Sequence, residues 1–248
     1  MNTSSSSDLT GKIALVTGAT RGIGRACAIA LADAGAHILA LGRTVGALEE
    51  LDDTIKKSGG SASLIPVDLT DDEAMNALAP ALTERFGKLD ILVGAAGVLG
   101  ELAPLADTSP KVWREVFDVN LHANWSLIRH LDPLLRASGA GRVALLTSRV
   151  GGEKPREFWG AYAASKAALE MMATTYAMEA NVSGVRVAII DPGAMRTNMR
   201  AQAMPGEDPN TLPAPEELAP LVRFATSLDY DGLAERLVFR DWKDSGRT

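Results

Sequence analysis

The sequence has few of the residues that bind metals or form covalent cross-links. Of its 248 residues, one is a cysteine, Cys27, and three are histidines, at positions 37, 122 and 130. A single cysteine excludes an intramolecular disulfide and metal clusters built on several cysteines. The histidines show no metal-ligand spacing, and a chain of this length buries about 70–75% of its unfolded surface without cross-links. We therefore expect a hydrophobic core and no metal site.

The sequence also lacks long apolar runs and an excess of positive charge. No run approaches the roughly 20 apolar residues that cross a bilayer. Lys and Arg number 25 against 31 Asp and Glu, giving a net charge of −6. The basic residues are scattered, which argues against a nucleic-acid partner. Residues 1–9 are expected to be a short disordered lead-in rather than a secretory signal, and the protein is expected to be cytoplasmic with Cys27 reduced.

From residue 10 to 248, short apolar runs alternate with longer amphipathic stretches, with no linker between them. The runs are continuous in Val, Ile and Leu, which is typical of parallel strands covered on both faces. Strands are expected at 12–17, 37–41, 63–67, 89–93, 142–147, 185–190 and 236–239. Helices are expected to end near 34 and 57 and to span 71–86, 110–137 and 160–181. This pattern predicts an α/β fold: a single-domain, Rossmann-type, doubly wound parallel sheet of about seven strands with helices on both faces.

Ligands of such sheets bind beyond the carboxyl ends of the strands, and the first strand is followed by a glycine-rich turn. Gly18, Gly22 and Gly24 have the spacing Gly-x-x-x-Gly-x-Gly, a variant of the dinucleotide-binding fingerprint. Glycines let the backbone approach a phosphate closely, and the next helix points its free N–H groups at the anion. A βα turn also carries glycine for purely steric reasons. The position directly after the first strand favours a dinucleotide.

The residues after the second and third strands bear on the choice of cofactor. No acidic residue follows the second strand to bind the ribose hydroxyls of NAD; Arg43 follows instead, and Arg21 lies in the glycine turn. Both guanidinium groups can hold a 2′-phosphate, which predicts NADP preference; a solvated arginine at a helix start is the alternative. Asp68, after the third strand, either accepts from an adenine amino group or caps the next helix.

Tyr162 and Lys166 are four residues apart near the start of a predicted helix and so share one face. A neighbouring ammonium favours the phenolate and lowers the tyrosine pKa, which suits a general acid or base. A tyrosine and a lysine four residues apart often occur by chance, so this pair alone does not indicate a catalytic site. Ser148, just beyond a strand, can donate a hydrogen bond to a substrate carbonyl. Asn120 lies inside a long helix, where an amide is mildly unfavourable unless it faces solvent or has a special role.

These motifs together resemble those of the short-chain dehydrogenases/reductases (SDR family) in order and spacing, over residues 10–228. The segments 159–166 and 196–209 are more narrowly similar to the YciK-like oxidoreductases. The resemblance implies that Tyr162 is the catalytic acid/base and that Lys166 bonds the nicotinamide ribose and lowers the Tyr162 pKa. It also implies that Ser148 orients the substrate oxygen and that Asn120 holds a water of a proton relay.

An NADP(H) site follows from the same resemblance and from the arginines above. The glycine turn would surround the pyrophosphate, the third strand would end beside adenine, small residues after the fourth strand would leave room for ribose, and the sixth strand would end at the nicotinamide. The expected cofactor-binding residues are Gly18, Thr20, Arg21, Gly22, Ile23, Gly24, Arg43, Asp68, Leu69, Ala95, Ala96, Gly97, Tyr162, Lys166, Pro192, Gly193 and Thr197.

The sequence departs from the family pattern in two places. After the fourth strand the family usually has Asn-Asn-Ala-Gly, but here residues 94–97 read Gly-Ala-Ala-Gly. The asparagine that ties this strand end to neighbouring backbone is missing, which leaves the local rigidity and the cofactor affinity open, while small residues still leave room for the cofactor ribose. The spacing of Ser148 and Tyr162 is one residue longer than the commonest arrangement. That residue falls in a loop, at 151–158, where insertion costs little.

The most strongly indicated function is NADP(H)-dependent interconversion of a small-molecule carbonyl, ketone or aldehyde, and an alcohol. A substrate lid is expected near 196–215 over a moderately apolar pocket, although ordinary loop packing would explain the same residues. The residues expected at the pocket are Leu99, Leu102, Trp159, Met199 and Met204. A non-catalytic NADP(H)-binding sensor or scaffold is the alternative, and an epimerase or dehydratase would need a larger substrate domain. The helices bearing Asn120 and Tyr162 are expected to form a homodimer or homotetramer.

Overall fold

The centre of the structure is a sheet of seven parallel strands in the order β3-β2-β1-β4-β5-β6-β7. The computed structural model describes residues 8–246, and the statements below concern these residues. The strands are β1 Ile13–Thr17, β2 His37–Gly42, β3 Ser61–Pro66, β4 Ile91–Gly94, β5 Arg142–Leu146, β6 Arg186–Asp191 and β7 Leu233–Val238. Because the chain runs outward from β1 in one direction and from β4 in the other, a crevice opens beyond the carboxyl ends of these two strands.

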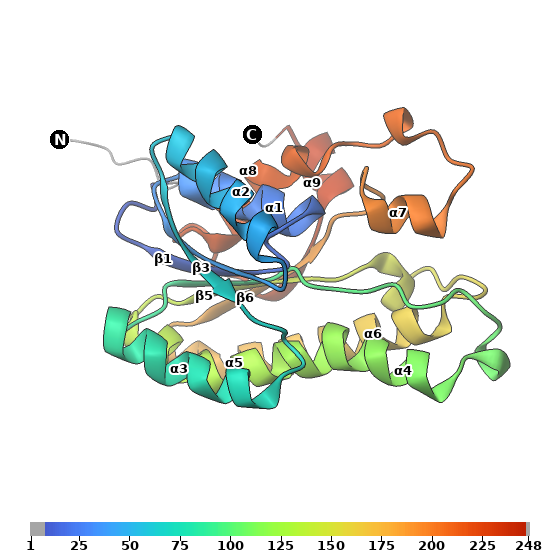
Figure 1. Cartoon of the computed structure of the whole chain (residues 1–248), viewed down its shortest axis with the longest axis horizontal. Helices are drawn as coiled ribbons and strands as arrows, with labels where there is room; N and C mark the ends of the chain where they lie inside the picture. The colour runs from blue at the N-terminus through green and yellow to red at the C-terminus, as the bar shows by residue number, and fades with distance from the viewer. Residues whose placement is uncertain (1–7, 247–248) are drawn as a thin grey trace.

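Helices cover both faces of the sheet, as Figure 1 shows. On one face are α1 Gly22–Asp33, α2 Val45–Lys57, α8 Ala219–Thr226 and α9 Phe239–Asp244; on the other are α3 Asp72–Phe86, α4 Pro110–Phe117, α5 Ala123–Ala137 and α6 Gly160–Ala180. A short helix, α7 Asn198–Ala203, projects at one end of the molecule. The predicted doubly wound, Rossmann-type architecture is confirmed.

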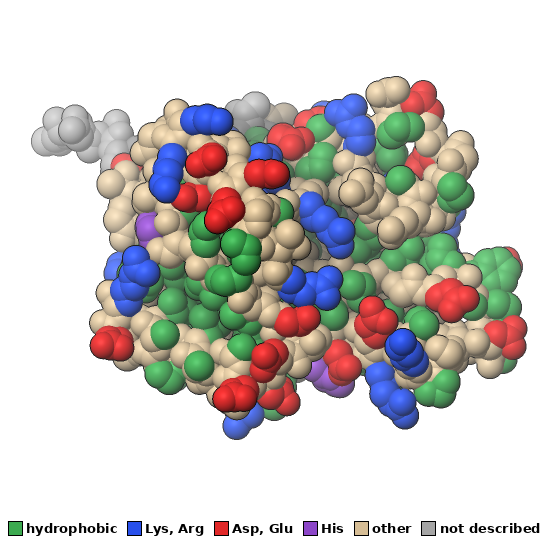
Figure 2. Space-filling view, in the orientation of Figure 1, with side chains coloured by type: hydrophobic (Ala, Val, Ile, Leu, Met, Phe, Trp, Pro, Cys, Tyr) green, Lys and Arg blue, Asp and Glu red, His purple; other side chains and the backbone are tan. Residues whose placement is uncertain are grey.

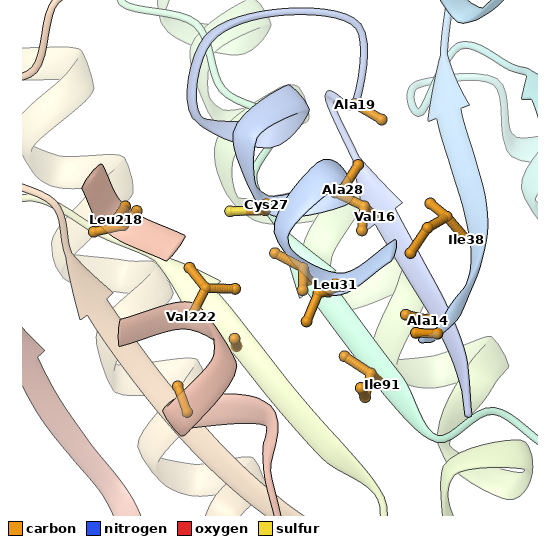
Figure 3. Close-up of a cluster of buried hydrophobic side chains, with 14 of the residues drawn as sticks. Ala14, Val16, Ala19, Cys27, Ala28, Leu31, Ile38, Ile91, Leu218 and Val222 are labelled. Atoms are coloured by element: carbon orange, nitrogen blue, oxygen red, sulfur yellow. The ribbon is translucent and has the colours of Figure 1, made fainter. Parts of the chain in front are cut away.

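Apolar side chains fill the space between the sheet and each helix layer. Figure 3 shows the cluster in which α1 packs against the central strands and α8, with Cys27, Ala28, Leu31, Val16 and Val222 among its buried members. Burial raises the pKa of the Cys27 thiol to about 12. This cysteine is therefore a core residue rather than a reactive group.

The helix predicted over 110–137 is interrupted by a π-helical turn, Asp118–His122. Asn124 Nδ2 donates to the carbonyl of Asn120 at 2.9 Å, which satisfies a backbone acceptor inside this turn. A π-turn leaves no periodic signature in the sequence, so the expectation of one regular helix was wrong at this point. The turn places Asn120 at the site described below.

The ends of the chain add two observations. Leu9 is buried, and its N–H donates to the carbonyl of Ala34 at 2.7 Å, so the folded part begins within the lead-in expected over 1–9. Residues 1–7 of that lead-in lie outside the described residues. Among the described residues, no helix combines the length and apolar character needed to span a membrane, and no cluster of side chains suits a metal ion.

Candidate active site

The glycine turn after β1 forms one wall of the crevice. A Cβ at Gly24 would overlap the carbonyl oxygen of Gly18, and a Cβ at Gly18 would lie 3.0 Å from Ala96 Cα. The turn therefore packs so closely on α1 and on the end of β4 that only glycine fits. Arg21, the N-cap of α1, makes no side-chain capping hydrogen bond, so the first N–H groups of this 12-residue helix face the crevice uncapped. These features fit the pyrophosphate of a dinucleotide.

The end of β4 is tied down by a residue that the sequence analysis did not single out for this role. Thr17 Oγ1 accepts hydrogen bonds from the N–H groups of Ala95 at 3.0 Å and Ala96 at 3.1 Å. This hydroxyl ties the segment after β4 to neighbouring structure, a connection of the kind that the missing asparagine makes in the family. Gly94 is required instead, since a Cβ there would overlap Asn124 Oδ1.

Arg43 and Asp68 lie together at the ends of β2 and β3. Arg43 Nη1 is 3.6 Å from Asp68 Oδ2, and both side chains are exposed. Asp68 also accepts from the N–H and hydroxyl of Thr70, and these bonds, with Arg43, lower its pKa. The cap of α3 is Asp71, not Asp68, so the capping interpretation of Asp68 is wrong. Arg43 and Asp68 thus form an exposed ion pair at the ends of two neighbouring strands.

Three further residues of the predicted cofactor site, Thr20, Gly97 and Thr197, lie close to neighbouring parts of the crevice. Thr20 packs against Gly42 at the end of β2, and Thr197 lies 3.5 Å from the place of a Cβ on Gly22. Gly97 faces Asn120 and Lys166, at 3.4 and 3.8 Å from its Cβ position. The structure thus brings Gly97, after the fourth strand, next to the predicted catalytic residues Asn120 and Lys166. Leu69 instead packs against the core on the α3 face.

Tyr162 and Lys166 lie on the inner face of α6, both buried. Lys166 Nζ donates to the carbonyl of Leu146 at 2.7 Å and lies 5.8 Å from the centroid of the Tyr162 ring. Burial lowers the pKa of Lys166 to about 8, although the charge of Glu170 acts in the opposite direction. A lysine that titrates near neutrality can exchange a proton as well as carry charge.

The pKa of Tyr162 differs from the value expected of a tyrosine beside a lysine. It is raised to about 12, chiefly by burial; a hydrogen bond with Ser148 acts to lower it, and the charge of Asp191 acts to raise it. The net shift is upward, opposite to the lowering expected from Lys166, because the phenol is almost fully desolvated. In this state Tyr162 is a protonated phenol beside the Ser148 hydroxyl, which suits proton donation.

Asn120 connects α6 to the segment after β4, and its solvent-facing alternative is excluded because the residue is fully buried. Its Oδ1 accepts from Val98 N at 2.8 Å, and its Nδ2 donates to Val98 O and Ser165 Oγ, each at 3.0 Å. Ser165 in turn donates to the carbonyl of Tyr162 at 2.8 Å. The amide therefore positions the helix turn that carries both Tyr162 and Lys166; a water relay through Asn120 stays a prediction.

An ionic cluster behind the site was not foreseen. Arg236 of β7 contacts Asp191 at 3.0 Å, Glu153 at 3.2 Å and Glu170 at 3.7 Å. Arg149, which follows Ser148, lies 3.7 Å from the same Asp191. Asp191 also accepts from Gly193 N at 3.0 Å, which shapes the predicted nicotinamide-binding turn. The sequence signal was the charge of Arg149 and Asp191 at two strand ends; nothing in it linked them to Arg236.

Part of the predicted site borders a cleft of about 830 Å³. Its walls include Ile23, Ser148, Tyr162, Pro192, Gly193 and Thr197 from the predicted site, together with Leu99, Trp159 and Met199. Leu102 and Met204 pack on the neighbouring apolar cluster instead. Residues of α9, which sequence reasoning did not assign to the site, close the cleft on the far side. In Figure 2 a hollow near the centre of the visible face, beside α7, has Lys or Arg side chains on its border.

The segment over the cleft is held by its own contacts. Thr197 caps α7 by accepting from Arg200 N at 3.2 Å, and Arg200 makes two hydrogen bonds to Glu207, at 2.5 and 2.6 Å. Arg196 N donates to the carbonyl of Pro213 at 2.9 Å, which closes the base of the segment. Residues 196–213 thus form a loop that is held by internal hydrogen bonds and lies beside both the glycine turn and Tyr162.

Comparison with known proteins finds one family model and several relatives that are similar to this chain. The family model of the short chain dehydrogenases matches residues 12–208. The oxidoreductase YciK of Escherichia coli K12 is 39% identical over 216 residues, which cover 86% of this chain and 85% of the relative. A short chain dehydrogenase from E. coli CFT073 complexed with NADPH is 36% identical, with a TM-score of 0.90 over 95% of this chain and 99% of that one. One from Shigella flexneri 2a, complexed with NADP, is also 36% identical, with a TM-score of 0.89 over 94% and 98%.

Proposed function

Because this chain belongs to the short-chain dehydrogenase family of oxidoreductases, we propose that it interconverts a carbonyl and an alcohol with NADP(H). The observation that carries this proposal is that Tyr162 and Ser148 line one cleft with Ile23 of the glycine motif, and that Lys166 Nζ lies 5.8 Å from the Tyr162 ring centroid. A proton donor and a phosphate-binding turn are the two parts that carbonyl reduction by a dinucleotide requires.

We propose that NADP(H), rather than NAD(H), is the cofactor. Arg43 and Arg21 offer guanidinium groups to a 2′-phosphate, and the end of β2 carries no carboxylate that would repel it. Asp68 holds Arg43 in place from the neighbouring strand. The NADPH and NADP complexes of the similar structures support the same choice.

In the proposed reduction, Ser148 and Tyr162 donate hydrogen bonds to the carbonyl oxygen and polarise it. When bound, NADPH supplies the hydride that adds to the carbonyl carbon. Tyr162 transfers its phenolic proton to the developing alkoxide, and the phenolate that remains is stabilised by the Lys166 ammonium. Lys166, with a pKa of about 8, can then return a proton to Tyr162. Alcohol oxidation reverses each step.

Transfer of label from NADPH deuterated at C4 tests this function. The purified chain is mixed with a panel of ketones and aldehydes, and the product alcohols are examined for deuterium by mass spectrometry. We expect deuterium on the former carbonyl carbon with the wild-type chain and a loss of at least about 10²-fold in rate with Tyr162→Phe.

Tyr176→Phe is the matched control. It removes a phenolic hydroxyl from the same helix, where Tyr176 donates to Asp132 outside the cleft, and it should retain transfer. Undiminished transfer by Tyr162→Phe would reject the role given to this residue. NADPH binding without any label transfer would favour a non-catalytic sensor or scaffold.

Three further properties are proposed. The segment 196–215 is the substrate lid of one domain spanning residues 10–248. Exposed Trp125, Met171 and Met178 on α5 and α6 provide an apolar face for a homodimer or homotetramer, and a monomer mass by light scattering would remove this proposal. A cytoplasmic location is also proposed, and recovery from another fraction of the cell would exclude it.

A further inference from the structure

Positive charge is concentrated around the cleft, although the chain as a whole carries a net charge of −6. Among the described residues, the walls of the cleft carry six basic side chains and only two carboxylates, those of Glu217 and Asp244. The basic side chains are Arg149, Lys154, Arg156, Arg200, Arg240 and Lys243. A cleft lined by one sign of charge concentrates ligands of the opposite sign.

Three of these basic side chains are neutralised within the protein. Arg200 is bound to Glu207 of the lid by two hydrogen bonds. Lys243 lies 2.8 Å from Glu217, and Arg240 lies 3.8 Å from Asp244. Arg200 lies in α7, and Arg240 and Lys243 lie in α9, so the basic residues of these two helices are paired with carboxylates.

The other three come from the segment that follows Ser148, and their charge is poorly compensated. Arg149 Nε is 3.7 Å from Asp191, but Asp191 is already held at 3.0 Å by Arg236, and Arg149 Nε is buried without a hydrogen-bond partner among the described residues. Lys154 and Arg156 make no ion pair with a carboxylate of the described residues within 4 Å.

The acidic residues near this segment do not neutralise it. Glu153 is turned toward Arg236, at 3.2 Å, and Glu157 does not line the cleft. Glu207 is within electrostatic reach of Arg156, but both of its carboxylate oxygens are bonded to Arg200. The uncompensated charge therefore lies on the substrate side of the cleft, apart from Arg21 and Arg43 at the cofactor side.

Arg156 is placed to reach a substrate held at Tyr162. Its guanidinium carbon is 5.4 Å from the centroid of Trp159, and the Trp159 ring lies edge-on to Tyr162 with 5.8 Å between their centroids. Both Arg156 and Trp159 line the cleft. One aromatic ring thus separates the cation from the proton donor, and a short apolar spacer can lie along that ring.

We infer that the substrate is an oxo acid, whose carbonyl is held by Ser148 and Tyr162 and whose remote carboxylate is bound by Arg156 with support from Lys154. This inference rests on the proposed function, because it assigns the substrate class of the same site. Arg149 adds to the attraction close to the carbonyl. The apolar wall formed by Leu99, Trp159 and Met199 accommodates the chain between the two groups.

Matched substrates test the inference. Aliphatic oxo acids with two to six methylene groups between carbonyl and carboxylate are compared with their methyl esters, using the wild-type chain with NADPH. We expect at least one acid to exceed its ester about tenfold or more in kcat/KM, because a hydrogen bond to a charged group contributes more than one to a neutral group. Esters that match or exceed their acids throughout the series would overturn the inference.

The variant Arg156→Gln tests whether Arg156 causes the preference for the acid over its ester. We expect the acid-to-ester ratio of kcat/KM to fall about tenfold or more, mainly through KM for the acid, and Arg156→Lys to restore part of it. Lys57→Gln, which removes an exposed positive charge from α2 far from the cleft, is the control and should keep the wild-type ratio. An unchanged ratio in Arg156→Gln would also overturn the inference.

A binding measurement separates failure of this inference from failure of the proposed function. Saturated carboxylates of the same chain lengths and their amides are titrated calorimetrically into the wild-type chain and Arg156→Gln, with NADP⁺ present. Carboxylate binding that is lost in Arg156→Gln supports the anion site even if no carbonyl is reduced. Reduction of neutral carbonyls without preferential carboxylate binding retains the function and rejects the anion site.

Discussion

Lys166 is a single side chain held in an environment that disfavours its charge. Its ammonium is buried, with Leu146 O as its hydrogen-bond acceptor, and burial lowers its pKa to about 8. A buried lysine without a directly paired carboxylate reduces the stability of the folded state. We therefore attribute its position to the stabilisation of a Tyr162 phenolate rather than to packing.

The lowered pKa makes stability depend on pH in a definite direction. Below about pH 8 both the folded and the unfolded chain carry the proton, and the folded state bears the full cost of burying it. Between about 8 and the ordinary value of 10.5 the folded chain releases the proton while the unfolded chain keeps it. Stability relative to a variant without this lysine should therefore rise with pH across that interval.

Urea unfolding of the wild-type chain and Lys166→Met at pH 7 and pH 10 measures this dependence. The wild-type chain should gain on the order of 2 kcal/mol relative to Lys166→Met between the two pH values. Lys111→Met, a change of an exposed lysine on α4, should show no such gain. Equal differences at both pH values for Lys166→Met would show that the lysine is not perturbed.

The positions of residues could be predicted from the sequence where they depend only on spacing within one helix or strand. Tyr162 and Lys166 share a helix face, and Ser148 follows a strand, so local spacing was enough to place them. The partners of Thr17 could not be found in this way, because its hydroxyl meets two amides that lie 78 and 79 residues further along the chain. The raised pKa of Tyr162 likewise depends on burial, which the spacing of two residues does not define.

At the scale of elements, the ends of β1 and β4 are joined by hydrogen bonds and close backbone packing. Thr17 ends β1 and ties the first residues after β4, and the Gly18 backbone packs against Ala96. The sequence placed predicted cofactor-binding residues after both strands, and the structure brings these two strand ends together. It did not reveal the hydrogen bonds that tie residues 95 and 96 to Thr17, because these residues follow a different strand from the one that carries the threonine.

Thr17→Val tests this connection, since valine has nearly the shape of threonine without the hydroxyl. Two backbone N–H groups would lose their acceptor, so we expect a loss of about 1–3 kcal/mol in the free energy of unfolding and weaker NADPH binding. Chemical denaturation and a fluorescence titration measure the two effects.

Thr83→Val is the control, because Thr83 donates only to a carbonyl of its own helix, α3, at an exposed position. It should change stability by less than about 0.5 kcal/mol. A Thr17→Val chain with wild-type stability and wild-type NADPH affinity would show that the segment 94–97 is held by other means.

At the scale of the whole molecule, the parallel sheet brings residues from six strand ends to one edge. The parallel sheet and the two helix layers could be predicted, because continuous apolar runs alternate with amphipathic stretches along most of the chain. The cluster of Arg236 with Asp191, Glu153 and Glu170 could not, because it joins β7, β6, a loop and α6 through side chains alone. The edge strand β7 also began earlier than expected, at Leu233 rather than 236, since its polar residues interrupt the apolar run.

Every role proposed for Tyr162 depends on a bound dinucleotide, so the most direct measurement is a fluorescence titration with NADPH and, separately, NADH. We predict clearly tighter binding of NADPH by the wild-type chain. Arg43→Asp should weaken NADPH binding about 10–100-fold and NADH binding much less, because only NADPH carries the 2′-phosphate. Arg85→Asp, an exposed change on α3, should leave both affinities near wild type. Tighter NADH binding, equal losses for both cofactors in Arg43→Asp, or no binding of either cofactor would contradict the assignment.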